Sequence, residues 1–260
     1  MNLVKVTLEK RPLYQERLRD LEALASYPLG TDRFTLSHGE DYFAFFDRLG
    51  TTHYYAMLDG NRLAAVGAGI LRKVPEKAWY VCDLKVHPDY RGQHIPLKMI
   101  TGAFFQNYIR CARGYGISMN SAGSKQNRVA KLAKHFKWAP TSSSTQLEIY
   151  SLDSAAIKQI APILEKHRGP ISYLSLAGKK DLILQSTGKP LPLLHAQFGP
   201  CAAGNVATPQ DNHTHMFCVP SQDPLAIELS SQQVLPSSSA TLIQHRMKHQ
   251  NWQHILTSDI

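Results

Sequence analysis

The stretch VCDLKVHPDYRGQHIPLKMI, residues 81–100, constrains the fold of this chain more than any other. A β-type run breaks at His87-Pro88, and helical spacing of apolar residues begins at Ile95. The first amides of a helix have no partners within the helix and lie at the positive end of its dipole, so strand-to-helix turns hold phosphates in many α/β proteins. The turn at Arg91-Gly92-Gln93 therefore predicts a phosphate-binding site.

Positive charge is concentrated around this turn. The chain has 29 Lys and Arg against 20 Asp and Glu, a net charge of +9, and residues 72–137 alone hold 13 basic and 3 acidic residues. Residues 151–260 are nearly balanced, with 8 basic and 7 acidic residues. A local excess of this kind predicts an anionic partner, which is a nucleic acid, an acidic membrane surface or a phosphorylated small molecule.

The first 152 residues alternate strand and helix patterns. We expect a strand at residues 3–8, a helix from Pro12, and a second helix after the capping-box sequence Ser37-His38-Gly39-Glu40. The Asp59-Gly60 pair predicts a hairpin, and residues 79–86 form the strand before the turn. The order β, α, α, β, β, β, α, β, α, β is that of a mixed α/β (α+β) domain.

Residues 153–260 have a different pattern. A helix ending at Gly169-Pro170 is followed by short alternating runs, which favour a second, mostly antiparallel β-rich unit. No internal repeat is evident in the sequence. The strand candidates are ISYLSLA, DLILQS, PLPLLHAQF, THMFCV, LAIELS, ATLIQHRM and WQHILTS.

Several classes of protein are disfavoured by composition. The four cysteines have no CxxC pair, which indicates a reducing compartment rather than a disulfide framework. There is no apolar run of signal-peptide or membrane-spanning length, so we expect a cytoplasmic protein that does not bind membranes. His213 and His215 would share a strand face near Cys218, but no further ligand follows at a defined spacing, so we expect no metal.

The residues around the turn resemble a known family. Leu84, Val86 and Pro88, followed by the loop residues 91–96, are similar to the strand end and loop of the GNAT superfamily of acyl-CoA-dependent N-acyltransferases. The resemblance covers residues 3–152 and implies a GNAT-like mixed sheet with flanking helices. It also implies that the backbone at Leu84 to Val86 pairs with pantetheine and that the loop binds the pyrophosphate. The loop residues implied are Arg91, Gly92, Gln93, His94, Ile95 and Pro96.

Two loop positions depart from the family pattern. His94 and Pro96 stand where the family usually has small residues, although proline is well accommodated in the first turn of a helix. The family's second signature, an Asn-containing helix, has its counterpart at residues 126–138. Aligned on Leu132 it places Gln126 at the Asn position, whereas the other register selects Asn127, which we include among the expected cofactor-binding residues.

The chemistry of the family requires a base and an acid. Asp83 lies on the strand that would face the thioester and is the candidate base, with a structural hydrogen bond as its other role. Alternation would place Cys82 on the opposite face, in the core. The second helix has no tyrosine to protonate the departing thiolate. The candidates that could replace it are water or Tyr54, Tyr55, Tyr80 and Tyr150.

These features predict an N-acyltransferase that moves an acetyl or other acyl group from acyl-CoA to a small-molecule or peptide amine by direct attack. Residues 1–152 would bind acetyl-CoA or another acyl-CoA, and residues 153–260 would bind the acceptor or mediate homodimer formation. The alternative is a GNAT-like ligand-sensing or interaction module without efficient turnover. Nucleic-acid binding is not favoured, because the basic residues of the segment 125–137 recur every three positions and drift around a helix.

Overall fold

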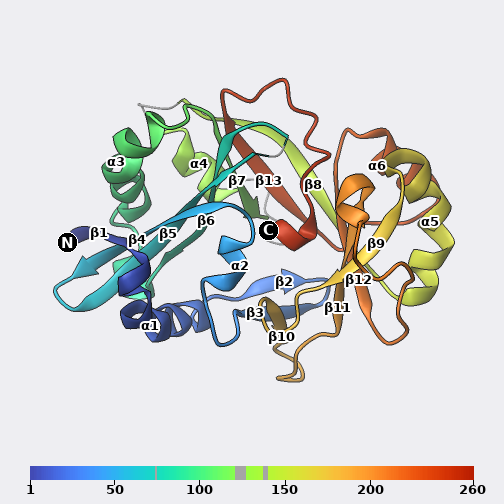
Figure 1. The fold of residues 1–260 in the computed structure, drawn as a ribbon, viewed down its shortest axis with the longest axis horizontal. Helices are drawn as coiled ribbons and strands as arrows, with labels where there is room; N and C mark the ends of the chain where they lie inside the picture. Colours follow the sequence, from blue (N-terminus) through green and yellow to red (C-terminus); the bar gives the residue numbers. More distant parts are fainter. Residues whose placement is uncertain (74, 121–126, 137–139) are drawn as a thin grey trace.

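The computed structural model describes residues 1–73, 75–120, 127–136 and 140–260. Its central feature is a mixed ten-stranded sheet that runs through the whole molecule, with helices on its faces (Figure 1). The strand order is β1-β4-β5-β6-β7-β13-β8-β12-β11-β9, and a second, three-stranded sheet has the order β10-β3-β2. The mixed α/β architecture predicted from the sequence is confirmed.

The N-terminal half contributes one end of the large sheet. The Asp59-Gly60 turn connects β4 and β5 as expected. Gly60 has a φ of 55°, in the left-handed region that glycine favours. Proline stands in the first turn of both α1 and α3. The elements are β1 (Asn2–Val6), α1 (Arg11–Ala23), β2 (Tyr27–Leu29), β3 (Asp32–Ser37), α2 (Ala44–Asp47), β4 (Thr51–Asp59), β5 (Arg62–Arg72), β6 (Ala78–Val86), α3 (Ile95–Tyr108), β7 (Gly114–Met119), α4 (Arg128–Ala133) and β8 (Ser142–Leu152).

The C-terminal half contributes the other end. Asp153 and Asp223 cap its two helices by accepting hydrogen bonds from the amides of Ala156 and Leu225. The elements are α5 (Ser154–Arg168), β9 (Ile171–Ser175), β10 (Asp181–Leu184), β11 (Leu193–Phe198), the 3₁₀ turn η3 (Gly199–Ala202), β12 (Thr214–Pro220), α6 (Pro224–Ser231), β13 (Ser238–His245) and the 3₁₀ turn η4 (Thr257–Asp259).

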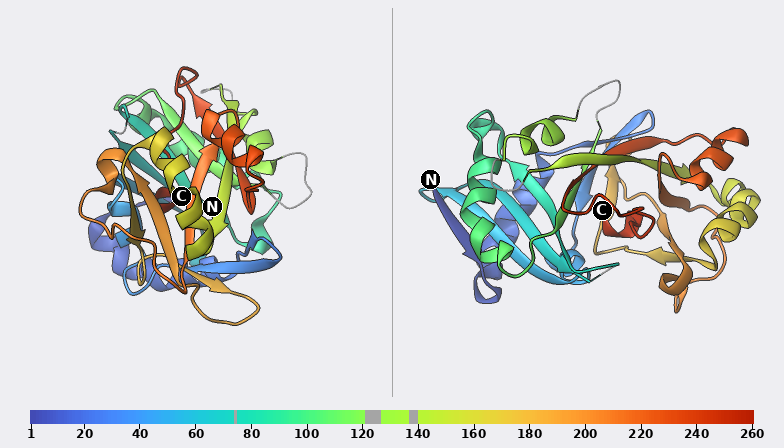
Figure 2. Two further views of the ribbon diagram at one scale, coloured as in Figure 1. Left: turned by 90° about the vertical axis from the view of Figure 1, so that its right-hand side faces the viewer. Right: turned by 90° about the horizontal axis from the view of Figure 1, so that it is seen from above.

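Part of the large sheet has the same local pattern on both sides of its centre, although β1 and β4 have no counterpart at the other end. The antiparallel pair β5 and β6 corresponds to β9 and β11, and the parallel pair β6 and β7 corresponds to the parallel pair β11 and β12. At the centre the halves exchange strands, because β13 pairs with β7 and β8 pairs with β12. In both views of Figure 2, β8 and β13 run together through the middle of the molecule.

Side-chain alternation separates two layers of core in the N-terminal half. Tyr54 and Ala56 of β4 pack in the cluster that includes α1, whereas Tyr55 and Met57 pack on the other face, in the cluster that includes α3. A third cluster in the C-terminal half joins α5 and α6 to β11 and β12. The two faces of the N-terminal part of the sheet therefore pack against different core clusters.

Three local expectations are wrong. The helix after residue 40 spans only Ala44–Asp47, and Ser37 ends β3 instead of capping it. LAIELS lies in helix α6, because Asp223-Pro224 is a helix start and Leu225, Ala226 and Leu229 bury one face. WQHILTS contains turns and η4 but no strand. Within the described ranges, no helix has the length and apolar character needed to span a membrane.

Candidate active site

The large sheet opens between β6 and β7. These parallel strands pair through only three residues each, from Trp79 to Val81 and from Gly114 to Gly116, and then diverge. The pairing of β6 with β5 shifts between Val66 and Ala68, a β-bulge in which Asp83 has a φ of 53°. The bulge bends β6 away from β7, so the sheet leaves a gap at its centre.

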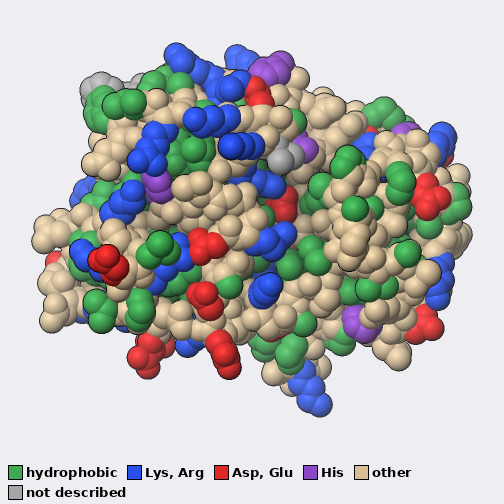
Figure 3. Space-filling model, viewed as in Figure 1, with side chains coloured by type: hydrophobic (Ala, Val, Ile, Leu, Met, Phe, Trp, Pro, Cys, Tyr) green, Lys and Arg blue, Asp and Glu red, His purple; other side chains and the backbone are tan. Residues whose placement is uncertain are grey.

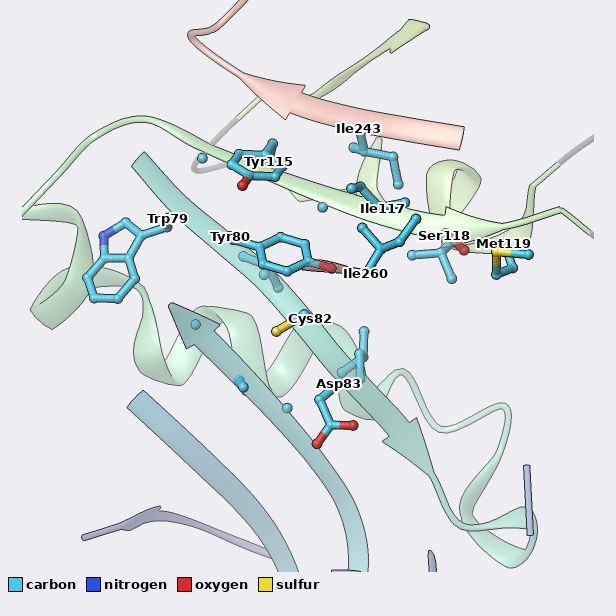
Figure 4. A pocket seen from close by; sticks show the side chains of 18 of the residues that line it. Trp79, Tyr80, Cys82, Asp83, Tyr115, Ile117, Ser118, Met119, Ile243 and Ile260 are labelled. Carbon is cyan, nitrogen blue, oxygen red and sulfur yellow. The ribbon is translucent and has the colours of Figure 1, made fainter. Parts of the chain in front are cut away.

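A cavity of about 490 Å³ passes through this gap. On the α3 face it is lined by side chains of α3 and α4, including Met99 and Phe104. On the opposite face it is lined by β3, β10, β11 and β12, including Leu182 and His195. Figure 4 shows Tyr80, Cys82 and Asp83 of β6 across the gap from the side chains of β7. The cavity therefore connects two faces of the sheet that are otherwise separated by its strands.

The carboxylate of Asp83 is held in a buried polar cluster. Lys85 forms an ion pair with both Asp83 and Glu22, and the Tyr54 hydroxyl donates to Asp83. The Tyr42 hydroxyl lies 3.0 Å from Asp83 Oδ2 and 3.1 Å from Glu22 Oε2. Burial raises the pKa of Glu22, but the hydrogen bond from His38 and the Lys85 ammonium outweigh burial and lower the pKa overall. This cluster leaves Asp83 with donors on both of its oxygens.

The expected separation of Cys82 from Asp83 is wrong. Cys82 packs against the α1-side core cluster, and Asp83 bonds to Tyr42 and Tyr54 of the same cluster. The bulge at Asp83 breaks the alternation and brings both side chains to one face. Burial raises the pKa of the Cys82 thiol to about 12, so Cys82 is a neutral thiol at pH 7 and not a nucleophile.

The predicted phosphate loop is open to solvent. Arg91, Gly92, Gln93 and His94 are exposed, whereas the side chain of Ile95 is fully buried in the α3-side cluster and fixes the start of α3. Leu84 and Val86 pack in the same cluster. His94 is the residue before α3 and has a φ of 55°, and Gly92 has a φ of 80°.

The backbone of this loop faces water. The amides of Gly92, Gln93 and His94 donate to no acceptor within the described residues, and Pro96 lies in the first turn of α3. The histidine and proline of the loop are thus compatible with an open helix N-terminus. Figure 3 shows Lys and Arg side chains over the region of α3, α4 and β7.

Asn127 has a structural role in the described part of the chain. Its Oδ1 accepts from the amides of Val129 and Ala130 and caps α4. Its Nδ2 donates to the end of β7, at 3.0 Å from the Ser118 carbonyl and 3.2 Å from that of Met119. Lys125, Gln126, Lys137 and Trp138 lie outside the described residues, and so does the register that places Gln126 at the Asn position.

Two of the four candidate tyrosines use their hydroxyl hydrogen within the protein, because Tyr54 donates to Asp83 and Tyr150 donates to Glu148 at 2.8 Å. Tyr55 accepts from Asn107 at 3.0 Å and packs on the α3 face of the sheet. Tyr80 stacks on Tyr115 with ring centroids 5.1 Å apart, and its hydroxyl makes no hydrogen bond among the described residues. In Figure 4 this hydroxyl points into the space between β6 and β7.

The structure separates two of the candidate metal ligands of the C-terminal half, His215 and Cys218. His215 packs edge-on against Tyr173, whereas Cys218, three residues along β12, lies in the core on the other face of the sheet. No group of three or more potential ligands occurs among the described residues. Instead, His195 and Lys180 line the cavity, a placement that no sequence motif indicated.

Comparisons with known proteins support this geometry. Residues 14–103 match the family model described as the acetyltransferase (GNAT) family. The uncharacterized protein L340 of Acanthamoeba polyphaga mimivirus is 22% identical over 232 residues, which cover 85% of this chain and 68% of that protein. A tandem GNAT protein from the clavulanic acid biosynthesis pathway has a TM-score of 0.52 at 10% identity, over 94% of this chain and 97% of that one. A GCN5-related N-acetyltransferase from Anabaena variabilis has a TM-score of 0.47 at 9% identity, over 94% and 72%.

The fold and the family match point to the same class of protein. The mixed sheet has a fold similar to that of a tandem GNAT protein. The segment 14–103, which includes the loop residues, matches the sequence pattern of the GNAT family.

Proposed function

We propose that the protein is an N-acyltransferase that moves an acyl group from acyl-CoA to a primary amine. The observation that carries this proposal is the cavity through the sheet, which is lined by α3 from Met99 onward and continues between β6 and β7 to the opposite face. An acyl-CoA and an acceptor could meet there from opposite sides.

The residues at the loop fit a pyrophosphate. The amides of Gly92, Gln93 and His94 are free and exposed, the dipole of the 14-residue helix α3 favours a negative charge, and Arg91 adds a flexible cation. The amide of Ile95 lies at the first turn of the same helix. The backbone from Leu84 to Val86 leads from this loop to the gap, and we assign it the pantetheine arm of the co-substrate.

The reacting centre lies near the bulge of β6. A neutral amine attacks the carbonyl carbon of the thioester, a new C–N bond forms, and the C–S bond breaks. We assign Tyr80 to protonate the departing thiolate, because its hydroxyl faces the gap and has no other partner there. Burial raises the pKa of Tyr80, so the hydroxyl keeps its proton at neutral pH.

The contacts of Asp83 favour a structural role, which is the other of the two roles considered for it. Its carboxylate is occupied by Lys85, Tyr42 and Tyr54, so removing a proton from an amine would require breaking this buried cluster. We propose that Asp83 maintains the bulge that opens the sheet. The proton acceptor is then another group that lines the cavity.

Calorimetry with CoA tests the binding site. Arg91→Glu should raise the dissociation constant of CoA about threefold to tenfold at low salt, because a cation beside the phosphates becomes an anion. Lys189→Glu, an exposed charge reversal in the C-terminal half, is the matched control and should leave binding unchanged. Equal binding by the wild type and Arg91→Glu would remove the loop from the site.

A transfer assay tests the reaction itself. The wild type should release free CoA thiol from acetyl-CoA in the presence of a primary amine such as hexylamine. Binding of CoA with no release across a panel of amines and acyl chain lengths would instead favour a ligand-sensing module.

A further inference from the structure

We propose that His195 is the proton acceptor for the attacking amine, and that its end of the cavity binds a neutral primary amine with an apolar body. This inference rests on the proposed function and specifies its acceptor site. His195 comes from the C-terminal half, more than 100 residues away in sequence from the bulge of β6.

The strand β11 directs His195 toward the cavity. Leu194, Ala196 and Phe198 pack in the core cluster under α5 and α6, so the alternate residues His195 and Gln197 face the other way. On that face, Gln197 contacts Ser258 and His195 contacts Thr257, both in η4. His195 is only 2% exposed and lines the cavity.

The hydrogen bonds around Thr257 define the tautomer of His195. Thr257 Oγ1 lies 3.0 Å from the carbonyl of Met216, which can only accept, so the single hydroxyl hydrogen of Thr257 is donated there. The same oxygen lies 3.0 Å from His195 Nδ1 and must accept from it. His195 therefore carries its hydrogen on Nδ1, and Nε2 has a free lone pair.

This lone pair has no partner in the protein. His195 Nε2 is buried and makes no hydrogen bond within the described residues. Buried polar atoms are nearly always satisfied, so an unpaired acceptor on the lining of a cavity indicates a ligand that donates to it. An amine N–H is such a donor.

The charges around His195 favour a neutral amine. Lys180 also lines the cavity, and Arg48 forms an ion pair with Asp259 of η4, which accepts a hydrogen bond from Arg72. Burial keeps the Cys218 thiol of β12 uncharged by raising its pKa to about 12. Burial and then the Lys180 and Arg48 cations lower the pKa of His195, so its lone pair is available at neutral pH. The same cations oppose an ammonium ion at this site.

The remaining walls are apolar at this end. Phe34 and Leu36 of β3, Leu182 of β10 and Met216 of β12 line the cavity around His195. They provide a surface for an alkyl or aryl group. The acidic side chain that lines the cavity, Asp83, is already paired with Lys85, so we infer a monoamine with an apolar body rather than a polyamine.

The proton balance of the reaction is complete with these groups. The amine nitrogen bonds to the thioester carbon, its N–H proton passes to His195 Nε2, and the C–S bond breaks. The sulfur takes a proton from Tyr80, and the proton held by His195 restores Tyr80 through water. The products are an N-substituted amide and CoA with a free thiol.

Substitution of His195 tests its role in turnover. His195→Asn retains an N–H group for Thr257 and removes Nε2, so we expect kcat with acetyl-CoA and hexylamine to fall about 100-fold or more with little change in KM for acetyl-CoA. The acid limb of the wild-type kcat–pH profile should disappear in this variant. His215→Asn is the matched control, because His215 is also buried but lies on the other face of the sheet. A His195→Asn variant that keeps kcat within threefold and retains the acid limb would overturn the proposal.

Thr257 provides a second pair of variants. Thr257→Ser keeps the hydroxyl that orients the ring and should retain kcat, whereas Thr257→Val should lower it while leaving KM for acetyl-CoA unchanged. Equal kcat in both variants would contradict the assigned tautomer.

A measurement without turnover separates this proposal from the proposed function. In ¹⁵N NMR of the wild type, His195 Nε2 should have the shift of an unprotonated ring nitrogen at pH 7.5, and hexylamine should change that shift without affecting His215. A protonated Nε2, or no response to hexylamine, would overturn the acceptor site even if the protein transfers acyl groups to other amines. A response to hexylamine without CoA binding would support the amine site but contradict the proposed acyltransferase function.

Discussion

The two sides of the large sheet both contain a parallel pair of strands next to an antiparallel pair, but they differ at the connection between the parallel strands. In the N-terminal half, β6 and β7 are joined through the exposed loop 91–94 and the 14-residue helix α3. In the C-terminal half, β11 and β12 also pair through only three residues, but η3 and an irregular segment join them. A helix N-terminus for phosphate binding is therefore present at one end only.

The two ends also differ in what occupies the space beside the parallel pair. At β6 and β7 this space is the cavity, whereas at β11 and β12 the alternate side chains pack under α5 and α6 in a closed core. The other face of β11 contributes His195 to the cavity. Under the proposed function, the N-terminal half would bind the acyl-CoA and the C-terminal half would provide the acceptor side.

The largest expected effect is on kcat, and it comes from comparing the loss of a tyrosine hydroxyl in each half of the molecule. Tyr80→Phe should lower kcat about 100-fold, equivalent to about 2.7 kcal/mol of activation free energy, because the thiolate loses its proton donor. Tyr173→Phe removes a hydroxyl from a buried ring of the C-terminal core and should leave kcat unchanged. Steady-state kinetics with acetyl-CoA and hexylamine measure both variants. Similar rates for Tyr80→Phe and the wild type would assign protonation to water.

The second prediction concerns the free-energy cost of burying the charged side chain of Lys180 in the C-terminal half. Lys180 is buried and has a cation–π contact with Phe45, 4.9 Å from the ring centroid, but no ion pair among the described residues. Burial lowers its pKa from 10.5 to about 8, so the unfolded chain binds this proton more tightly than the native protein does. The native state is thus destabilised by the protonated lysine below pH 8, and this destabilisation disappears as the pH rises toward 10.5.

Lys180→Met should therefore raise the free energy of unfolding at pH 7 by about 2 kcal/mol, because it removes the buried charge and keeps the apolar stem. The gain should shrink between pH 8 and pH 10.5, as measured by urea denaturation at each pH. Lys179→Met, at the exposed neighbouring position, should change neither quantity. A gain that is the same at pH 7 and pH 10.5 would show that charge burial is not its source.

The smallest expected effect compares two loop glycines. Gly92 and Gly204 both have a φ of 80°, and an added Cβ would meet no atom within 4 Å at either position. Valine at either site should therefore cost a similar 1–2 kcal/mol in backbone strain, by the order of magnitude for this conformation. Only Gly92→Val should also weaken CoA binding, by about tenfold or 1.4 kcal/mol, in calorimetry. Equal losses of CoA affinity in both variants would mean that the loop at Gly92 has no special role in binding CoA compared with the connection after β11.

Much of the N-terminal half could be predicted because its signals are local. The Asp59-Gly60 hairpin, the strand 78–86, and the helix that starts at Ile95 each follow from residues adjacent in sequence. The same kind of reasoning misplaced Asp83, because a β-bulge depends on the pairing with β5 and not on the sequence of β6 alone. It also took LAIELS for a strand, since a short apolar run fits both a buried strand and a helix face.

The amino-acid sequence by itself determined the GNAT-like strand, loop and helix around Arg91, since amide geometry and helix initiation depend on neighbours along the chain. Only the tertiary structure decided that β13 returns to lie between β7 and β8 and that His195 shares a cavity with Tyr80. These contacts join segments that lie far apart in the sequence, and the register of the strands is fixed by the burial of whole faces of the sheet. Alternation within β11 shows that His195 and Leu194 face opposite ways, but not which of the two faces the gap.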